Sequence, residues 1–141
     1  MTDEMGKQIE RCTGKVPHRF IRRNIFFCHR DFDLILNRYE QGKLFYMYTG
    51  RGPSAEALHL GHAIPFIMNQ YMQEAFDVPL VIQVTDDEKY MYRPELGFDQ
   101  VVHMGISNIK DIIAFGFSVE KTFIFLDTQY IKYMYANVIK V

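Results

Sequence analysis

Two histidines, His59 and His62, lie three positions apart with Gly61 between them, at the start of an apolar stretch that contains Pro65. Proline has no backbone N–H, so a helix tolerates it best before its internal hydrogen bonds begin. A helix is therefore predicted to begin, or to be kinked, near these histidines. Its first turn would carry free amides and the positive end of the helix dipole, which attract a polyanion such as a nucleotide phosphate.

This loop and helix start also have plainer interpretations. A single histidine beside an apolar helix is commonly structural, and the Gly/Pro loop before it is commonly just a turn. Together they favour a nucleotide site, because His59 and His62 flank one opening and Gly61 lets a flat base or ribose approach the backbone. Paired histidines could also bind zinc, but the intervening glycine and the lack of a nearby cysteine disfavour this, and no metal site is predicted.

A second set of polar residues belongs to the apolar run LVIQV. Gln83 lies inside the run, and Asp86, Asp87, Glu88 and Lys89 come soon after it. A glutamine there is a buried polar side chain that must find partners, for which neighbouring backbone would be sufficient. The acidic residues could form a solvated turn, or bind a cation such as Mg²⁺ or an amino group. Their place at the end of the run favours a functional role.

The elements that must position these residues alternate along the chain. Apolar runs predict buried strands at residues 43–50, 80–86 and 122–128, the first ended by Gly50. Helical spacing predicts two helices between them, with these apolar faces: Ile64, Ile67, Met68, Tyr71, Met72 and Ala75 in the first, and Val102, Ile106, Ile109 and Ile113 in the second. The alternation predicts a parallel sheet with right-handed crossovers, an open α/β fold.

Such sheets bind ligands beyond the carboxyl ends of their strands, which selects residues 48–52, residues 83–89 and the chain from Asp127 onward. One further helix is predicted ahead of the sheet, at residues 31–42. Asp31 is its candidate N-cap, and Gly42 ends it. Its apolar face is formed by Phe32, Ile35, Leu36 and Tyr39.

The bulk composition limits the class of protein. With 141 residues the chain suits one domain but is short for a multi-substrate enzyme, so it could be a fragment. A net charge of -1 argues against a broad basic surface for nucleic acid. Cys12 and Cys28 indicate a reduced, cytosolic protein with buried or inert thiols. No stretch approaches the roughly 20 apolar residues of a membrane span, so no membrane contact is expected.

Four strings carry a resemblance to a known family: PHRFIRRNIFFCHRDF, YMYTGRGPSAEALHLGHAIPFI, VPLVIQVTDDEKYMY and KDIIAFGFSVEKTFIF. HLGH is similar to the H-x-G-H motif of class I aminoacyl-tRNA synthetases, and the long strings resemble the eukaryotic cytosolic tryptophanyl-tRNA synthetases from about Ile9 to the end. H-x-G-H alone also occurs in other nucleotidylyl transferases. The resemblance implies the first half of a Rossmann-like nucleotide-binding fold over residues 43–141, after an N-terminal helical extension over residues 1–42.

The resemblance also implies a reaction. In this family the carboxylate of tryptophan attacks the α-phosphate of ATP, giving tryptophanyl-adenylate and pyrophosphate, and the tryptophanyl group then passes to tRNA(Trp). Such catalysis depends on positioning and on stabilising phosphate charge, with Mg²⁺ bound to ATP. A cytoplasmic homodimer without a tightly bound cofactor is the form that the resemblance implies.

The resemblance assigns roles to ten residues. ATP would be bound by Thr49, Arg51, Gly52, His59, Gly61 and His62, with His59, His62 and Lys89 as the catalytic residues. Tyr48 and Gln83 would accept the indole N–H, and Glu88 would bind the substrate ammonium. Apart from this resemblance, Tyr48 would be interpreted as one more core aromatic.

The sequence departs from the family pattern in what it lacks. It has no K-M-S loop, no second half of the nucleotide-binding fold and no helical anticodon domain. The expectation is therefore an incomplete catalytic fragment of a tryptophan-tRNA ligase, inactive by itself. The alternatives are a non-catalytic binding or regulatory module derived from a synthetase, and a related tyrosyl-tRNA ligase.

Overall fold

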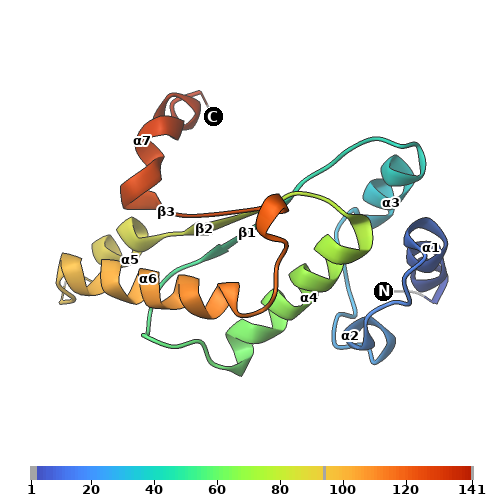
Figure 1. The fold of residues 1–141 in the computed structure, drawn as a ribbon, viewed down its shortest axis with the longest axis horizontal. Helices are drawn as coiled ribbons and strands as arrows, with labels where there is room; N and C mark the ends of the chain where they lie inside the picture. The colour runs from blue at the N-terminus through green and yellow to red at the C-terminus, as the bar shows by residue number, and fades with distance from the viewer. Residues whose placement is uncertain (1–2, 94, 141) are drawn as a thin grey trace.

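A three-stranded parallel sheet lies at the centre of the protein, in a computed structural model that describes residues 3–93 and 95–140 (Figure 1). Its strands are β1 (Met47–Arg51), β2 (Leu80–Val84) and β3 (Thr122–Leu126), in the order β1-β2-β3. Helix α4 (Leu60–Phe76) connects β1 to β2, and α5 (Asp86–Tyr92), α6 (Phe98–Ile113) and the short 3-10 helix η1 (Val119–Lys121) precede β3. The predicted parallel α/β fold is confirmed.

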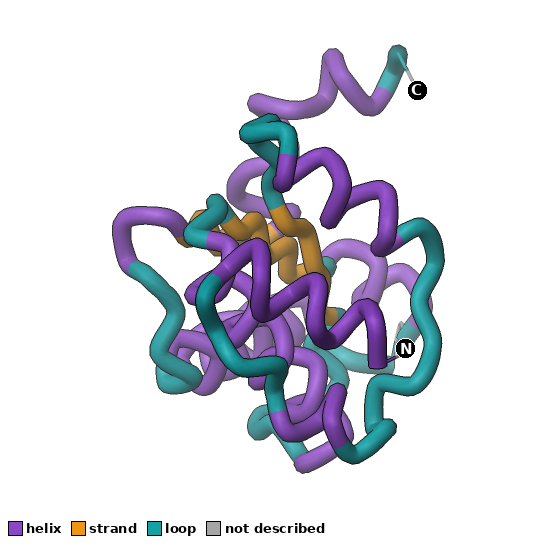
Figure 2. Tube along the Cα trace, turned by 90° about the vertical axis from the view of Figure 1, so that its right-hand side faces the viewer, coloured by secondary structure: helices purple, strands orange, loops and turns teal. Residues whose placement is uncertain are grey.

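The remaining helices lie at the two ends of the chain. The N-terminal helices are α1 (Asp3–Thr13), α2 (Arg19–Arg22) and α3 (Phe32–Glu40), and α7 (Asp127–Val138) follows β3 directly. Figure 2 shows the strands at the centre with helices around them and α7 at the top. The expected N-terminal helical extension is present, and it includes α1, whose Met5 and Ile9 are buried.

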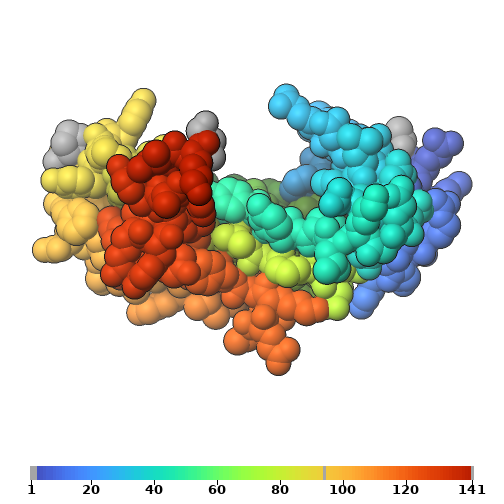
Figure 3. Space-filling model, turned by 90° about the horizontal axis from the view of Figure 1, so that it is seen from above, coloured from blue at the N-terminus to red at the C-terminus, as the bar shows by residue number. Residues whose placement is uncertain are grey.

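The two faces of the sheet have different surroundings. Leu80, Ile82 and Val84 alternate along β2 and are almost fully buried, and Leu80 and Ile82 share a core cluster with Phe66 of α4 and Ile112 of α6. On the other face, Tyr48 of β1 is 59% exposed and Phe123 of β3 is 41% exposed. Seen from above, that face lies in a hollow between α7 and the segment containing α3 (Figure 3).

Strand β1 differs from its prediction as a buried strand. It begins at Met47 rather than near Lys43, and it continues through Gly50 to Arg51. It pairs only with β2 among the described residues, so one edge of β1 is open and its outer face meets the hollow. The aromatic run that suggested burial therefore supplies exposed side chains as well as core ones.

The N-terminal helices share a hydrophobic core with α4. The cluster contains Met5, Ile9, Ile21, Leu36, Met68, Ala75, Phe76 and Val78.

The ends of α3 can be compared with their predictions. Gly42 lies after α3 with φ +70°, which confirms the predicted stop. Asp31 is the N-cap residue of α3, as predicted, but it has φ 58° and forms no side-chain capping bond, because its left-handed backbone prevents the usual cap geometry. Ile35 is 37% exposed, at the margin of the predicted apolar face.

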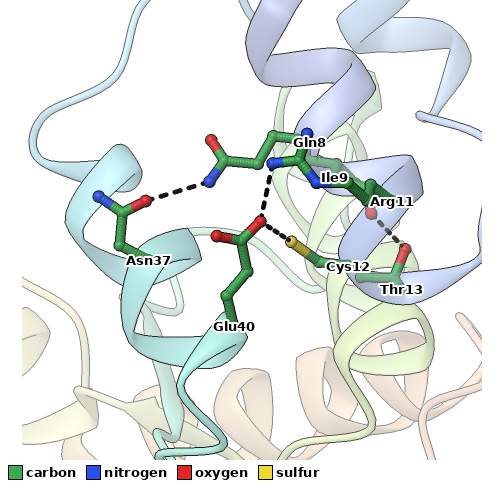
Figure 4. Close-up of polar contacts among 7 residues, drawn as sticks. All are labelled: Gln8, Ile9, Arg11, Cys12, Thr13, Asn37 and Glu40. Atoms are coloured by element: carbon green, nitrogen blue, oxygen red, sulfur yellow. Dashed lines mark hydrogen bonds and ion pairs between the residues drawn. The ribbon is translucent and has the colours of Figure 1, made fainter.

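Polar contacts fasten α1 to α3 (Figure 4). Gln8 Nε2 donates to Asn37 Oδ1 at 3.1 Å, and Arg11 Nη2 donates to Glu40 Oε1 at 2.9 Å. The Cys12 thiol donates to the same Glu40 oxygen at 3.2 Å. Burial, and then Glu40, raise the pKa of Cys12 to about 11, which keeps the thiol protonated and unreactive at neutral pH. Cys28 is exposed.

Helix α6 presents a different face to the core from the one predicted. Ile106 and Ile113 are 40% and 59% exposed. The buried face consists of Val101, Met104, Gly105, Asn108 and Ile112. A glycine and an asparagine interrupt that face, so apolar spacing alone selected the neighbouring stripe.

Gly105 marks a close approach between α6 and the sheet. A Cβ atom there would lie 2.6 Å from Leu126 Cδ2 and 3.6 Å from Val84 Cγ1. We expect Gly105→Val to lower the free energy of unfolding by about 1–3 kcal/mol, because the added carbons overpack a core that has no room for them. Denaturant unfolding of the variant measures this loss.

Gly97→Ser is the matched control. Gly97 is the N-cap residue of α6, and a Cβ atom there has no heavy atom within 4 Å. Serine is a favoured N-cap residue, so this variant should unfold at the wild-type denaturant concentration or above it. Equal losses in both variants would contradict the close-packing explanation.

Candidate functional site

The candidate site lies at the carboxyl ends of the three strands, as expected for a parallel sheet. Arg51, Val84 and Leu126 pair in register at these ends, so the segments that follow them start side by side. They are the loop of residues 52–59, helix α5 and helix α7. Two groups of polar side chains gather there, one on the open face of the sheet and one around the loop.

Tyr48, Gln83 and Asp127 form a connected set on the open face. The Tyr48 hydroxyl donates to Gln83 Oε1, and Gln83 Nε2 donates to both carboxylate oxygens of Asp127 at 2.7 and 2.8 Å. Tyr48 pairs with Val81 and Gln83 with Gly50, which puts both side chains on one face of neighbouring strands. The predicted pair is therefore in contact, and the amide of Gln83 bonds side chains rather than backbone.

Asp127 is the first residue of α7 and is 3% exposed. Burial raises the pKa of its carboxyl to about 6; the Gln83 hydrogen bond opposes this shift, while Asp87 and Asp86 add to it. Near neutral pH the carboxyl is mostly ionised, and it then acts only as an acceptor.

The raised pKa of Asp127 predicts a pH-dependent contribution to stability. Above about pH 6 the carboxyl is ionised in both the folded and the unfolded chain. The free energy of unfolding is then lowered by the whole cost of burying this charge. As the pH falls towards about 4, the folded protein binds the proton first, so this contribution to the free energy of unfolding rises. We expect Asp127→Asn, which is neutral throughout, to be more stable than wild type at about pH 8 and to lose that advantage near pH 4.

Thermal unfolding of both proteins across this range is the measurement. Carboxyl groups remote from residue 127 are the same in the two proteins, so the difference between their melting temperatures isolates residue 127 and its interaction with Asp86 and Asp87. A difference that stays constant with pH would contradict the assignment.

The acidic residues after β2 divide between two environments. Asp86 is fully buried, and its carboxylate accepts from the backbone N–H of Thr128, at 3.1 Å, and from the Thr128 hydroxyl. The alternative of a solvated turn is therefore wrong for Asp86, which ties α5 to the first turn of α7. Glu88 is exposed, and among the described residues its side chain forms no hydrogen bond to Tyr48 or Gln83.

Arg51 ends β1 as a buried cation, 9% exposed. Its Nε donates to Asn108 Oδ1 at 2.9 Å, and its Nη2 lies 3.5 Å from Ser54 Oγ. Both partners are neutral, and burial lowers the pKa of the guanidinium. None of the ion pairs found among the described residues includes Arg51. A buried cation with neutral partners favours binding of an anion.

Helix α6 holds the loop that follows Arg51. Asn108 Nδ2 donates to the carbonyl oxygens of Ala55, at 2.7 Å, and Glu56, at 3.2 Å. Asp111 Oδ2 accepts from the backbone N–H of Leu58 at 3.1 Å. These bonds fix the path of the loop between β1 and α4.

The paired histidines begin α4 as predicted. His59 is the N-cap, and its Nδ1 accepts from the backbone N–H of Gly61 at 3.1 Å. The rings of His59 and His62 stack with their centroids 3.6 Å apart. A Cβ atom on Gly61 would lie 3.1 Å from the ring of His59, so the cap itself favours glycine here. Helix α4 passes through Pro65 without ending.

His62 carries an unsatisfied buried atom. Its Nδ1 has no hydrogen-bond partner among the described residues. Burial lowers the pKa of His62, and the charges of Arg51 and His59 lower it further, so the imidazole is neutral near pH 7. A buried polar atom without a partner is a group that a ligand can satisfy.

Lys89 and Gly52 complete this part of the site. A Cβ atom on Gly52 would lie 3.4 Å from Lys89 Cε and 3.4 Å from Thr85 Oγ1. The side chain of Lys89, from α5, therefore covers the loop at Gly52. Thr49 alternates with Tyr48 along β1 and therefore lies on the opposite face of the sheet. The structure thus gathers Arg51, Gly52 and Lys89 at one strand end, whereas Thr49 lies on the other face from the Tyr48–Gln83 pair.

Sequence reasoning missed three residues of the site. Asp127 was marked only as the start of a third segment, and Asn108 and Asp111 were not considered. A sequence cue existed for Asn108 and Asp127, because an Asn in an apolar helix and an Asp after an apolar strand both need partners.

The part of the chain that the structure describes contains neither a cluster of metal-binding side chains nor a helix that could span a membrane. No group of three or more His, Cys, Asp and Glu side chains there is arranged to hold a metal ion. None of the described helices has both the length and the apolar character needed to cross a bilayer.

Comparison with known proteins gives a consistent result, although no protein-family model matches the chain. The chain is 55% identical over 98% of its length to the cytoplasmic tryptophan–tRNA ligase of Rattus norvegicus. Its fold matches the tryptophanyl-tRNA synthetase of Plasmodium falciparum with a TM-score of 0.94 at 51% identity, covering 99% of this chain and 38% of that one. It matches the tryptophan-bound enzyme of Encephalitozoon cuniculi with a TM-score of 0.93 at 41% identity, covering 99% and 41%.

The chain matches only part of the length of each relative. The chain spans 29% to 36% of the length of the cytoplasmic tryptophan–tRNA ligases it matches. Nearly the whole chain is nevertheless included in both the sequence and the fold comparisons. Over this portion, the chain belongs to the family of eukaryotic cytosolic-type tryptophanyl-tRNA synthetases.

Proposed function

We propose that this chain supplies the first half of a nucleotide-binding catalytic domain that activates tryptophan with ATP and passes it to tRNA(Trp). Residues 43–141 would form that half, and residues 1–42 its N-terminal extension. The carboxylate of tryptophan attacks the α-phosphate, and pyrophosphate leaves. The protein needs no nucleophile of its own, so its task is to orient both substrates and to stabilise the charge on the phosphates.

The tryptophan side of the proposal rests on the open face of the sheet. Gln83 Oε1 and the oxygen of Tyr48 both have lone pairs that an indole N–H can use. An amino acid without that donor would leave these acceptors unpaired, which makes the pair a device for specificity. Glu88 would meet the substrate ammonium from the exposed surface of α5.

The ATP side rests on the loop between β1 and α4. Arg51 offers a buried guanidinium, and His62 offers an unsatisfied Nδ1. The backbone around Gly52 and Gly61 lets phosphates or ribose approach closely, with His59 and Lys89 beside them. Thr49 belongs to this group by family resemblance, and the alternation along β1 puts its side chain on the same face as that of Arg51. Mg²⁺ would arrive bound to the phosphates, as the substrate complex.

Several finer properties follow from the relatives and are part of the same proposal. The relative from Rattus norvegicus is named as a cytoplasmic enzyme, which favours a cytoplasmic location. A homodimer is the assembly we expect for the full-length protein. Because the chain spans about a third of its relatives, we expect the 141 residues alone to catalyse little tryptophan-dependent pyrophosphate exchange.

The observation that carries the proposal is the contact between Tyr48 and Gln83 at the carboxyl end of the sheet. Thermal-shift titration of the chain with non-hydrolysable analogues of tryptophanyl-adenylate and tyrosyl-adenylate tests it, since a ligand that binds only the folded state raises its stability. We expect stabilisation by the tryptophanyl analogue alone. A larger shift with the tyrosyl analogue would overturn the specificity. Pyrophosphate exchange by the full-length protein then tests the reaction itself.

A further inference from the structure

The hydrogen bonds between Asp127, Gln83 and Tyr48 all run in one direction. Asp127 accepts from Gln83 Nε2 with both oxygens, and Gln83 Oε1 accepts from the Tyr48 hydroxyl. An ionised carboxylate can only accept, so it fixes which end of the Gln83 amide faces it. The Tyr48 proton is then committed to Gln83, and only lone pairs remain to face a ligand.

We propose that Asp127 is a positioning residue that sets the polarity of the indole site, holding the Gln83 amide so that Tyr48 and Gln83 present acceptors only. This inference rests on the proposed function and extends it, because it assigns a specificity role to a residue that does not itself meet the substrate. If the Gln83 amide were reversed, its Nε2 would face Tyr48 and the ligand, and the site would repel an N–H donor.

The position of Asp127 suits this role. It follows Leu126 directly at the end of β3, and Leu126 pairs with Val84, next to Gln83 on the neighbouring strand. Helix α7 cannot easily shift away from Gln83, because buried Asp86 accepts from both the backbone N–H and the hydroxyl of Thr128. The carboxylate is thus held within hydrogen-bond distance of one side chain by the first turn of its own helix.

A purely structural role accounts less well for the arrangement. A buried carboxylate whose nearest charged neighbours are the acidic Asp86 and Asp87 of α5 destabilises the fold rather than supporting it. Tyr48 is the titratable neighbour on the side of β1, and it is neutral near pH 7. An asparagine would fill the same space without a charge. The charge is explained if the ligand requires a fixed amide orientation.

The test compares two substrates in the full-length protein. Tryptophan and 3-(benzothiophen-3-yl)alanine have nearly the same shape, but sulfur replaces the indole N–H in the second. The ratio of their kcat/KM values in pyrophosphate exchange reports the acceptor polarity of the site, and overall damage to the fold or to ATP binding cancels in that ratio. Asp127→Asn is the main variant, since its amide can both donate to and accept from Gln83.

We expect Asp127→Asn to lower the tryptophan preference about 10-fold or more, the effect of losing a fixed, charge-assisted hydrogen bond. Asp127→Glu, which keeps the carboxylate, should restore most of it. Asp99→Asn is the matched control, because Asp99 is an exposed carboxyl in the first turn of α6. Asp127→Ser is measured in parallel, so that a neutral variant remains available if Asp127→Asn does not fold.

The outcomes separate this inference from the proposed function. If wild type does not activate tryptophan, the proposed function fails and this inference fails with it. If wild type activates tryptophan and prefers it over the analogue, but the neutral Asp127 variants keep that preference, only the polarity role is overturned. The polarity role is supported if Asp127→Asn and Asp127→Ser lose the preference for tryptophan while Asp127→Glu and Asp99→Asn keep it.

Discussion

Replacing Gln83 by Leu should reduce kcat/KM for tryptophan in pyrophosphate exchange by about 100-fold or more. The change removes one acceptor for the indole N–H and also leaves the Tyr48 hydroxyl and the Asp127 carboxylate without their partner. Each unmade bond of this kind costs roughly 1–3 kcal/mol. The measurement is steady-state exchange by the full-length protein at saturating ATP, with KM for ATP measured separately.

Gln41→Leu provides the comparison for this variant. Gln41 is exposed just after α3, so the same chemical change there should leave kcat/KM within about twofold of wild type. KM for ATP should be nearly unchanged in both variants. If Gln83→Leu raised KM for ATP as much as it lowered tryptophan use, the assignment of Gln83 to the amino-acid side would be wrong.

Replacing Arg51 by Met should raise KM for ATP about 10- to 100-fold, the loss expected when a charge-assisted bond to phosphate is removed. The effect on stability should be small, within about 1–2 kcal/mol, because the lost bond to Asn108 is offset by removing a buried cation that has neutral partners. Stability and ATP use should therefore separate in this variant. KM for ATP and denaturant unfolding are the two measurements.

Arg51→Lys refines the same experiment. Lysine keeps the charge but loses the planar fork of donors, so KM for ATP should lie between wild type and Arg51→Met. Arg38→Met, at an exposed position of α3, serves as the control for the loss of a surface arginine. Two results together would show that Arg51 supports the loop rather than binding the nucleotide. They are that Arg51→Met unfolds under conditions in which wild type stays folded, and that Arg51→Lys leaves KM for ATP unchanged.

Much of the fold was predictable because its signals are local. The apolar runs at the three strands and the helical spacing between them each lie within a short window, and the α/β alternation leaves few topologies. The start of α4 at His59 was also local, since the N-cap, glycine and proline chemistry lies within a few residues. The division of the chain at residue 42 stays a prediction, although both sides of it contribute to one core cluster.

The errors arose where tertiary contacts outweigh local pattern. The buried face of α6 contains Gly105 and Asn108 because the sheet approaches closely at one and the loop needs a donor at the other. Neither requirement is visible in hydrophobic spacing. Asp86 was interpreted with Asp87 and Glu88 as one acidic group, but its partner is Thr128, 42 residues away in sequence.

In the candidate site, too, some contacts could be predicted from the sequence and others depend on tertiary structure. The resemblance to a family selected Tyr48 and Gln83 correctly as neighbours, and the alternation of side chains along parallel strands explains why they meet. Asp127 could not be joined to them from sequence alone, since that contact depends on how β3 pairs with β2. The ligand roles of all these residues stay predictions until binding is measured.

The outer strands of the small sheet have a practical consequence for handling the protein. Among the described residues, β1 and β3 each pair on one side only, so both leave a row of backbone donors and acceptors along an open edge. Such edges can add a strand from another copy, and the exposed aromatic side chains of Tyr46, Tyr48 and Phe123 lie close to them in sequence. When the 141 residues are expressed alone, we therefore expect precipitation that increases steeply with concentration, and Tyr46→Lys should reduce it.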